Sequence, residues 1–174
     1  MNTAWDLFVH ELRDMLNAEN KLVHALGEME RESKNPELQE AFREHRKQTE
    51  QHAVRLIDIM RDIGNTPEQS ECKGIDGLVQ EKKMFMEKHP SENILEVFNI
   101  GAGIKAERYE ISAYESLIDL AQQLGALNSA KLLKQNLNEE QEALHKLQQL
   151  GPRIKPNELG ITGNIEGGLP RKAA

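Results

Sequence analysis

The chain has 174 residues and a formal net charge of −7. Asp and Glu outnumber Lys and Arg by 29 to 22, so no basic stripe is left to neutralise phosphates, which excludes a nucleic-acid scaffold. No stretch is apolar enough to cross a membrane, the first residues do not form a secretory signal, and a single cysteine, Cys72, cannot form an intrachain disulfide. We therefore expect a cytoplasmic protein that binds neither nucleic acid nor membranes.

The composition is typical of an all-α protein that forms one domain. Aromatic residues make up only 4% of the chain, so the core must be built mainly from Leu and Ala. Gly and Pro lie mostly at the ends of segments in which apolar residues recur every three or four positions. That spacing places one apolar stripe on each expected helix.

Two long helices are expected in the first third of the chain. Thr3-Ala4-Trp5-Asp6 has the form of a capping box and predicts the first helix start. The apolar stripe that follows contains one charged residue, Glu19. Asn35-Pro36 predicts the start of the second helix, because Asn caps helices and Pro suits the first helical position. The stripe of this second helix, which ends by Gly64, carries three polar residues at its centre: His45, Thr49 and His52.

A loop over residues 65–77 and a short helix over residues 78–88 are expected next. His89-Pro90-Ser91 ends that short helix and begins the third long helix, which stops near Gly125.

The fourth long helix is expected to begin at Asn128 or Ser129 and to stop at Gly151. The residues after it show no apolar periodicity. We therefore expect a bundle domain of residues 1–151 and a mobile tail of residues 152–174.

The most informative stretch, Lys105–Tyr114, lies in the middle of the third long helix. Extending the apolar stripe through it places Glu107, then Glu110 or Ile111, then Tyr114 on the buried face. An ionised carboxylate on a core stripe is costly because it gives up its water. Two of them one turn apart call for a cation.

A weak internal repeat links this stretch to the other helices. Glu19 precedes His52 by 33 positions, and Glu107 precedes Glu140, on the fourth stripe, by 33 as well. Two helical hairpins of this kind pack as an antiparallel four-helix bundle. The polar residues of all four stripes then meet at mid-height.

Converging carboxylates repel one another and take up protons unless a cation neutralises them. Carboxylates and imidazoles are ligands that iron and manganese accept, and two divalent ions bring four positive charges. We therefore predict a dinuclear iron or manganese site with five ligands: Glu19, His52, Glu107, Glu110 and Glu140.

A metal-free alternative stays open. The same residues would then form a hydrogen-bonded polar layer that fixes helix register in a non-catalytic homodimer acting through protein partners. His45 is interpreted as a structural histidine and Cys72 as an idle loop thiol. Tyr109 is expected at the periphery, and the pair Glu142-x-x-His145 on the solvated surface beside the stripe.

Five motifs carry a family resemblance: Leu7–Leu12, Ala18-Glu19, His45 with Thr49, Glu107–Tyr114 and Asn138-Glu139-Glu140. Over roughly residues 3–150 they resemble the YciE/YciF family, bacterial ferritin-like proteins linked to stress responses and without an established reaction. The resemblance implies a ferritin-like bundle with a short extra helix between the second and third long helices. Taken together with the polar residues, it leads to the hypothesis of a stress-related di-metal protein whose iron or manganese reacts with oxygen or peroxide, and leaves open whether the protein is an enzyme.

The ferritin-like pattern places Glu-x-x-His on the second and fourth helices, and this chain departs from it. The second helix offers Thr49-x-x-His52, with Gln48 where relatives tend to carry Glu, and the fourth offers Glu140-x-x-Ala143. Partial, mononuclear or absent metal are therefore alternatives to a full dinuclear site.

The resemblance also implies a homodimer. Six large apolar side chains, more than one slim bundle readily hides, favour it as well: Trp5, Phe8, Phe42, Met84, Met86 and Phe98.

Overall fold

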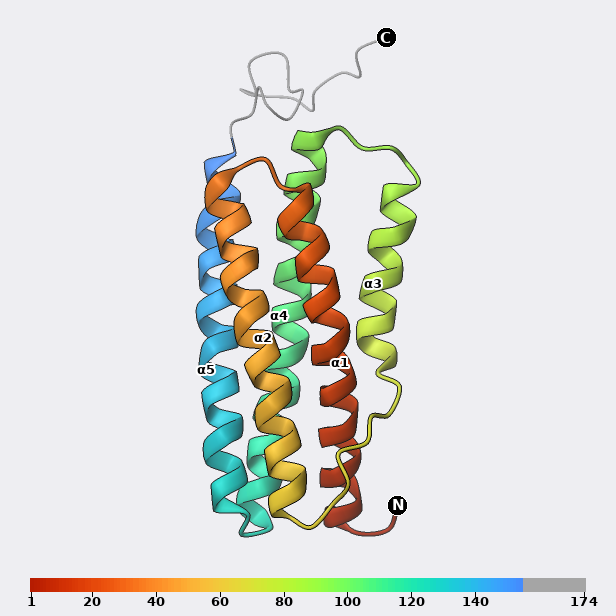
Figure 1. Ribbon diagram of the computed structural model, residues 1–174, viewed down its shortest axis with the longest axis vertical. Helices are drawn as coiled ribbons and strands as arrows, with labels where there is room; N and C mark the ends of the chain where they lie inside the picture. The colour runs from red at the N-terminus through yellow and green to blue at the C-terminus, as the bar shows by residue number, and fades with distance from the viewer. Residues whose placement is uncertain (155–174) are drawn as a thin grey trace, which may run out of the picture.

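A computed structural model describes residues 1–154, and the regular elements in this range are all helices. In chain order they are α1 (Ala4–Glu32), α2 (Pro36–Asp62), α3 (Lys73–Met86), α4 (Glu92–Gln123) and α5 (Leu127–Leu150), followed by the short 3₁₀ helix Gly151–Arg153. In Figure 1, α1 and α5 run up, α2 and α4 run down, and α3 stands beside the four long helices.

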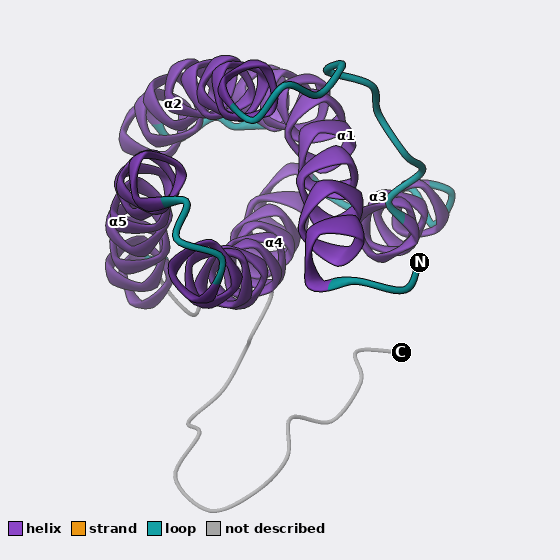
Figure 2. Ribbon diagram, turned by 90° about the horizontal axis from the view of Figure 1, so that it is seen from below, coloured by secondary structure: helices purple, strands orange, loops and turns teal. Residues whose placement is uncertain are grey.

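Viewed along the bundle, α1, α2, α5 and α4 follow one another around a ring (Figure 2). Each long helix packs against two neighbours, and α3 lies outside the ring against α1 and α4. The predicted all-α, ferritin-like antiparallel four-helix bundle, with a short extra helix between the second and third long helices, is confirmed.

The predicted helix ends follow from local hydrogen bonds. The N–H of Asp6 donates to Thr3 Oγ1 at 3.1 Å and the N–H of Thr3 donates to Asp6 Oδ2 at 3.0 Å, which is the expected capping box. Asn35 Oδ1 accepts from two backbone N–H groups of the first turn of α2, at 2.8 and 3.3 Å. Gly64 and Gly125, which end α2 and α4, both have φ of +73°, a conformation that favours glycine.

The expected loop over residues 65–77 is too long, because α3 already begins at Lys73. Gly74 lies so close to the ring of Tyr109 that a Cβ at this position would collide with it. The glycine that suggested a loop therefore allows a close contact inside a helix. Tyr109 lies at the edge of the core, as expected: this side chain is half-buried against α3, and its hydroxyl lies 3.3 Å from Cys72 Sγ.

The apolar core consists of two clusters on either side of a polar layer. The larger cluster joins the first half of α1 to the second halves of α2 and α4, with Phe8, Leu12, Leu56 and Leu117 fully buried. The smaller one lies at the opposite end of the bundle and contains Phe42, Leu147 and their neighbours. Burying one such side chain contributes about 1.5–3 kcal/mol, so the two clusters stabilise the helices above and below the polar layer.

None of the helices within residues 1–154 combines the length and apolarity that a bilayer crossing requires. Most of the predicted tail, residues 155–174, lies outside the described residues.

Candidate metal centre

Six ionisable side chains from the four long helices meet between the two apolar clusters. This polar layer consists of Glu19 from α1, His45 and His52 from α2, Glu107 and Glu110 from α4, and Glu140 from α5, and every member is buried. All five predicted ligands belong to it. The spacings of three and seven residues on α4 and α2 keep these side chains on one helical face.

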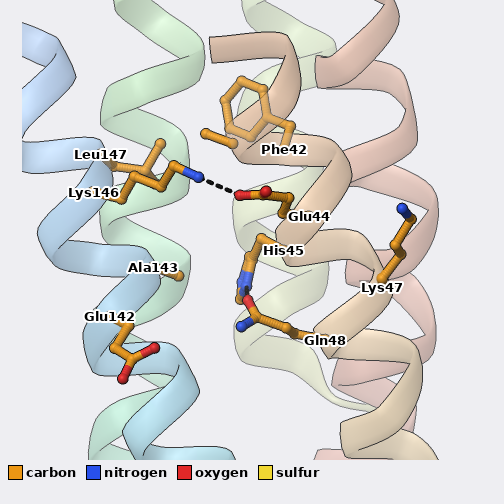
Figure 3. Close-up of a pocket in the computed structure, with 10 residues that line it drawn as sticks. Phe42, Glu44, His45, Lys47, Gln48, Glu142, Ala143, Lys146 and Leu147 are labelled. Atoms are coloured by element: carbon orange, nitrogen blue, oxygen red, sulfur yellow. Dashed lines mark hydrogen bonds and ion pairs between the residues drawn. The ribbon is translucent and has the colours of Figure 1, made fainter. Parts of the chain in front are cut away.

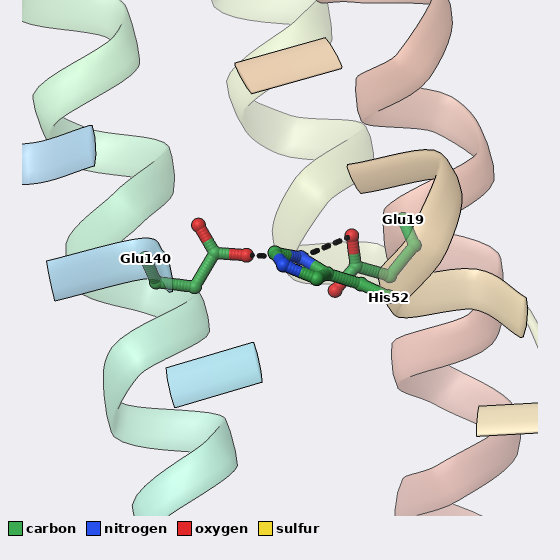
Figure 4. Close-up of side chains that lie close together, drawn as sticks. All are labelled: Glu19, His52 and Glu140. Atoms are coloured by element: carbon green, nitrogen blue, oxygen red, sulfur yellow. Dashed lines mark ion pairs between the residues drawn. The ribbon is translucent and has the colours of Figure 1, made fainter. Parts of the chain in front are cut away.

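Glu19, His52 and Glu140 form the first of two triads (Figure 4). His52 Nδ1 lies 2.8 Å from Glu140 Oε1 and 3.6 Å from Glu19 Oε2. The second triad consists of His45, Glu107 and Glu140. His45 Nε2 lies 3.0 Å from Glu107 Oε1 and 3.3 Å from Glu140 Oε2. Glu140 thus presents one oxygen to each histidine.

The donor atoms of each triad lie within 4.8 Å of one another, close enough to hold a metal ion. Within the described part of the chain, several of the buried atoms have no hydrogen-bond partner: Glu19 Oε2, His52 Nδ1, Glu107 Oε2, Glu110 Oε1 and both oxygens of Glu140. The short His52–Glu140 distance therefore does not correspond to a well-aligned hydrogen bond. A buried polar atom without a partner costs about 1–3 kcal/mol, so a satisfied polar layer does not describe this arrangement. Bound cations would use these lone pairs.

Glu139 and Arg55 set the orientation of the His52 ring. His52 Nε2 lies 2.7 Å from Glu139 Oε2, and Arg55 donates two further hydrogen bonds to Glu139, at 2.8 and 3.0 Å. When a carboxylate accepts a hydrogen bond from one ring nitrogen, the proton stays on that nitrogen and the lone pair of the other nitrogen faces the metal position. The structure therefore directs Nδ1 toward Glu19 and Glu140.

The pKa values of this pair reflect the same contacts. Burial alone would raise the pKa of Glu139, but the hydrogen bonds from His52 and Arg55 outweigh it and lower that pKa to about 2. Burial lowers the pKa of His52, but the charge of Glu19, the hydrogen bond with Glu139 and the close contact with Glu140 raise it to about 12. Without a cation, this ring would hold a second proton.

The carboxyls of the polar layer resist ionisation in the metal-free protein. Burial raises the pKa of Glu107 and of Glu140 to about 7, with a smaller increase from the charge of Glu19 in the first case and of Glu107 in the second. Burial also raises the pKa of Glu19, and that of Glu110 further still because three other carboxylates of the layer surround it. Protons and divalent cations therefore compete for the same oxygens.

A chain of hydrogen bonds supports Glu19 from the edge of the bundle. The Tyr114 hydroxyl donates to Glu19 Oε1, and Asn136 Nδ2 donates to the Tyr114 oxygen at 3.0 Å. Asn136 Oδ1 in turn accepts from Arg55 at 2.8 Å. Tyr114 is fully buried, as predicted, and its contact with Glu19 fixes the carboxylate beside His52.

The structure also shows where the other candidate residues of the site lie. His45, which the sequence suggested was structural, stands in a triad with two carboxylates. Glu110 is buried beside His45 but belongs to neither triad, so its role as a ligand stays a prediction. Glu142 and His145 are exposed, as expected, and therefore α5 presents no histidine to the layer.

Sequence reasoning missed Glu139, because it lies beside the apolar stripe rather than on it. The sequence feature that could have identified Glu139 is the adjacent pair Glu139-Glu140, which can face His52 and Arg55, two residues one turn apart on α2.

Comparison with known proteins supports the resemblance seen in the motifs. The family described as "Domain of unknown function (DUF892)" matches residues 3–159. Protein YciF of Escherichia coli (strain K12) is 34% identical over 151 residues, which is 86% of this chain and 91% of that protein. The crystal structure of the E. coli stress protein YciF superposes with a TM-score of 0.83 and 31% identity, over 93% of this chain and 100% of that one. YcfI from Rhodopseudomonas palustris superposes with a TM-score of 0.82 and 31% identity, over 84% of this chain and 94% of that one.

Proposed function

This chain belongs to the DUF892 family, and we propose that it is a stress-related protein that binds two divalent metal ions, iron or manganese, inside its helical bundle. One observation carries the proposal. Both carboxylate oxygens of Glu140 are buried without a hydrogen-bond partner, and each faces a different histidine of the polar layer. A carboxylate in that position suits a bridge between two cations. The link to stress rests on the description of the E. coli relative.

The ligand sets follow from the two triads. Glu19 and His52 would hold one ion, Glu107 and His45 the other, and Glu140 would bridge them. Together with Glu110, the layer carries four carboxylates, whose charge two divalent ions balance. The two triads contain four of the five predicted ligands and add His45, while Glu110 lies outside both.

Bound iron or manganese supplies one-electron chemistry toward oxygen or peroxide. The residues of this chain prepare the site for it. Glu139 holds His52 in one tautomer, Tyr114 orients Glu19, and the two apolar clusters exclude water above and below the layer. Catalysis by the bound ions would require oxygen, peroxide or another substrate to reach them.

We extend the proposal to a cytoplasmic homodimer. The single cysteine, Cys72, is buried and burial raises the pKa of its thiol, which suits a reducing compartment. Trp5, Met84 and Leu127 are exposed apolar side chains that a partner subunit would cover.

Metal analysis of protein purified from its native host tests the proposal. We expect about two transition-metal ions per chain, and a loss of both in Glu140→Gln, because this substitution removes the shared charge and keeps the shape. Glu142→Gln, on the exposed face of the same helix, is the matched control and should retain them. Stoichiometric metal missing from the wild-type protein would favour the alternative, a protonated polar layer that only fixes helix register.

A further inference from the structure

A cavity of about 430 Å³ lies between α2 and α5, on the side of the bundle opposite α3. Ten residues of these two helices line it: Ala41, Phe42, Glu44, His45, Lys47, Gln48, Glu142, Ala143, Lys146 and Leu147 (Figure 3). Among them only His45 belongs to the polar layer. The cavity therefore reaches the proposed metal centre at one residue, from the side of the second triad.

The two ends of the cavity differ in chemistry. At one end Phe42 and Leu147 present an apolar wall that is continuous with the smaller core cluster. At the other end Gln48 Oε1 lies 3.4 Å from His45 Nδ1. His45 Nε2 faces Glu107 and Glu140, so the ring stands between the cavity and the carboxylates.

A small side chain keeps this space open. Ala143 follows Glu140 by one turn of α5 and therefore lies on the same helical face, where a larger side chain would occupy the space beside His45. The exposed ion pair between Lys146 and Glu44 crosses the outer side of the cavity and joins the two helices (Figure 3). Two Lys and two Glu line the cavity, so their charges cancel and the local electrostatic field favours neither an anionic nor a cationic ligand.

Resting on the proposed metal centre, we infer that this cavity binds a small amphipathic molecule with an oxygen-donor group at one end and a short apolar body. The donor group lies at His45, beside the second triad, and the body packs on Phe42 and Leu147. The volume falls within the range of roughly 300–1,000 Å³ typical of small-molecule sites, far above the ~30 Å³ share of one water.

Two carboxylic acids of different length test the inference on protein loaded with cobalt(II), with their binding measured by titration calorimetry. Each buried CH₂ contributes about 0.8 kcal/mol, roughly a fourfold gain in affinity. Pentanoate has three more CH₂ groups than acetate and should therefore bind at least about tenfold more tightly. Equal affinities on a protein that holds the metal would overturn the inference and leave the proposed function intact.

Ala143→Leu should fill the cavity, remove most of the preference for pentanoate and leave the cobalt content unchanged. Ala102→Leu is the matched control, since Ala102 lines the separate apolar groove between α1, α3 and α4. Gln48→Phe provides a second way to narrow the cavity if Ala143→Leu does not fold. A preference that survives in whichever of these variants folds would overturn the inference.

A further measurement needs no metal. Diethyl pyrocarbonate should modify His45 in the metal-free protein through the cavity, and Ala143→Leu or Gln48→Phe should slow that reaction severalfold, as read by mass spectrometry. His10, which is exposed near the start of α1, supplies the internal control and should react at an unchanged rate. An unchanged rate at His45 as well would overturn the inference, whatever the metal content.

Discussion

At the scale of single residues, the polar layer is a balance between burial and charge. Glu107 and Glu140 have pKa values of about 7 because burial disfavours their ionised forms. His52 has a pKa of about 12 because it stands among carboxylates. The same atoms that hold protons in the metal-free protein would bind cations, so metal and proton occupancy are linked.

The metal-free protein should lose stability as the pH rises from about 4.5 to about 7. A carboxyl whose pKa is raised on folding binds more protons in the folded state across this window, so the free energy of unfolding decreases there. His52 acts in the same direction between about pH 6.5 and pH 12, because the folded state keeps a proton there that the unfolded state has released. We expect the melting temperature, measured after chelation, to fall by several degrees between pH 5 and pH 7.5.

The double variant Glu107→Gln with Glu140→Gln should weaken that dependence, because neither amide titrates and only Glu19, Glu110 and His52 still contribute to it. A wild-type melting temperature that rises steadily over the same window would contradict the raised pKa values.

Glu139 offers a test of how the His52 ring is held. Glu139→Gln keeps all proposed ligands but removes the charge that fixes the ring, and we expect metal affinity to fall about 10–100-fold. Competition with a chelator measures this affinity, and Glu142→Gln supplies the control. Unchanged affinity would show that His52 needs no help from Glu139.

At the scale of the helices, α3 shows how a tertiary contact overrides local preference. Gly74 and Gly77 both lower the helix propensity of this segment, and the sequence alone therefore favours a loop. The ring of Tyr109 lies against Gly74, whereas nothing lies within 4 Å of a Cβ placed at Gly77. The first glycine is needed for packing and the second is not.

Substitutions at these two glycines should therefore have opposite effects. Gly74→Ala should lower the free energy of unfolding by about 1–3 kcal/mol, because Tyr109 must move. Gly77→Ala should raise it by up to about 1 kcal/mol, since Ala is the better helix former. Chemical denaturation measures both, and stabilisation by Gly74→Ala would refute the proposed contact.

At the scale of the whole molecule, the open question is what covers the exposed apolar side chains. Phe8 and Phe42 were part of the case for a homodimer, but both are buried in the core and cannot contribute to an interface. Of the other four, Met86 and Phe98 are half-buried, and Trp5 and Met84 have 43% and 56% of their surfaces exposed. The homodimer therefore stays a prediction that rests on fewer residues.

Light scattering at micromolar concentration should report twice the chain mass of 19.8 kDa. A single species of 19.8 kDa would show that these apolar side chains face solvent in a monomer, which isolated exposed residues often do.

The four long helices, the caps at Thr3 and Asn35 and the height of the polar layer can be predicted from the residue pattern alone. Capping at Thr3 and Asn35 depends on atoms within three residues, and the stripe positions of Glu19, His52, Glu107 and Glu140 follow from the period of one helix at a time. These are local relations, so they can be read without knowing how the helices pack.

Which side chains meet depends on how the helices pack. The rotation and height of each helix relative to its neighbours come from packing, and these place His45 with Glu107 and Glu140, leave Glu110 outside both triads, and bring Glu139 to His52. The early start of α3 has the same origin, a ring on α4 that fits a glycine 35 residues before it. A single sequence carries no direct signal for distances between helices, and the chemistry of this site depends on those distances.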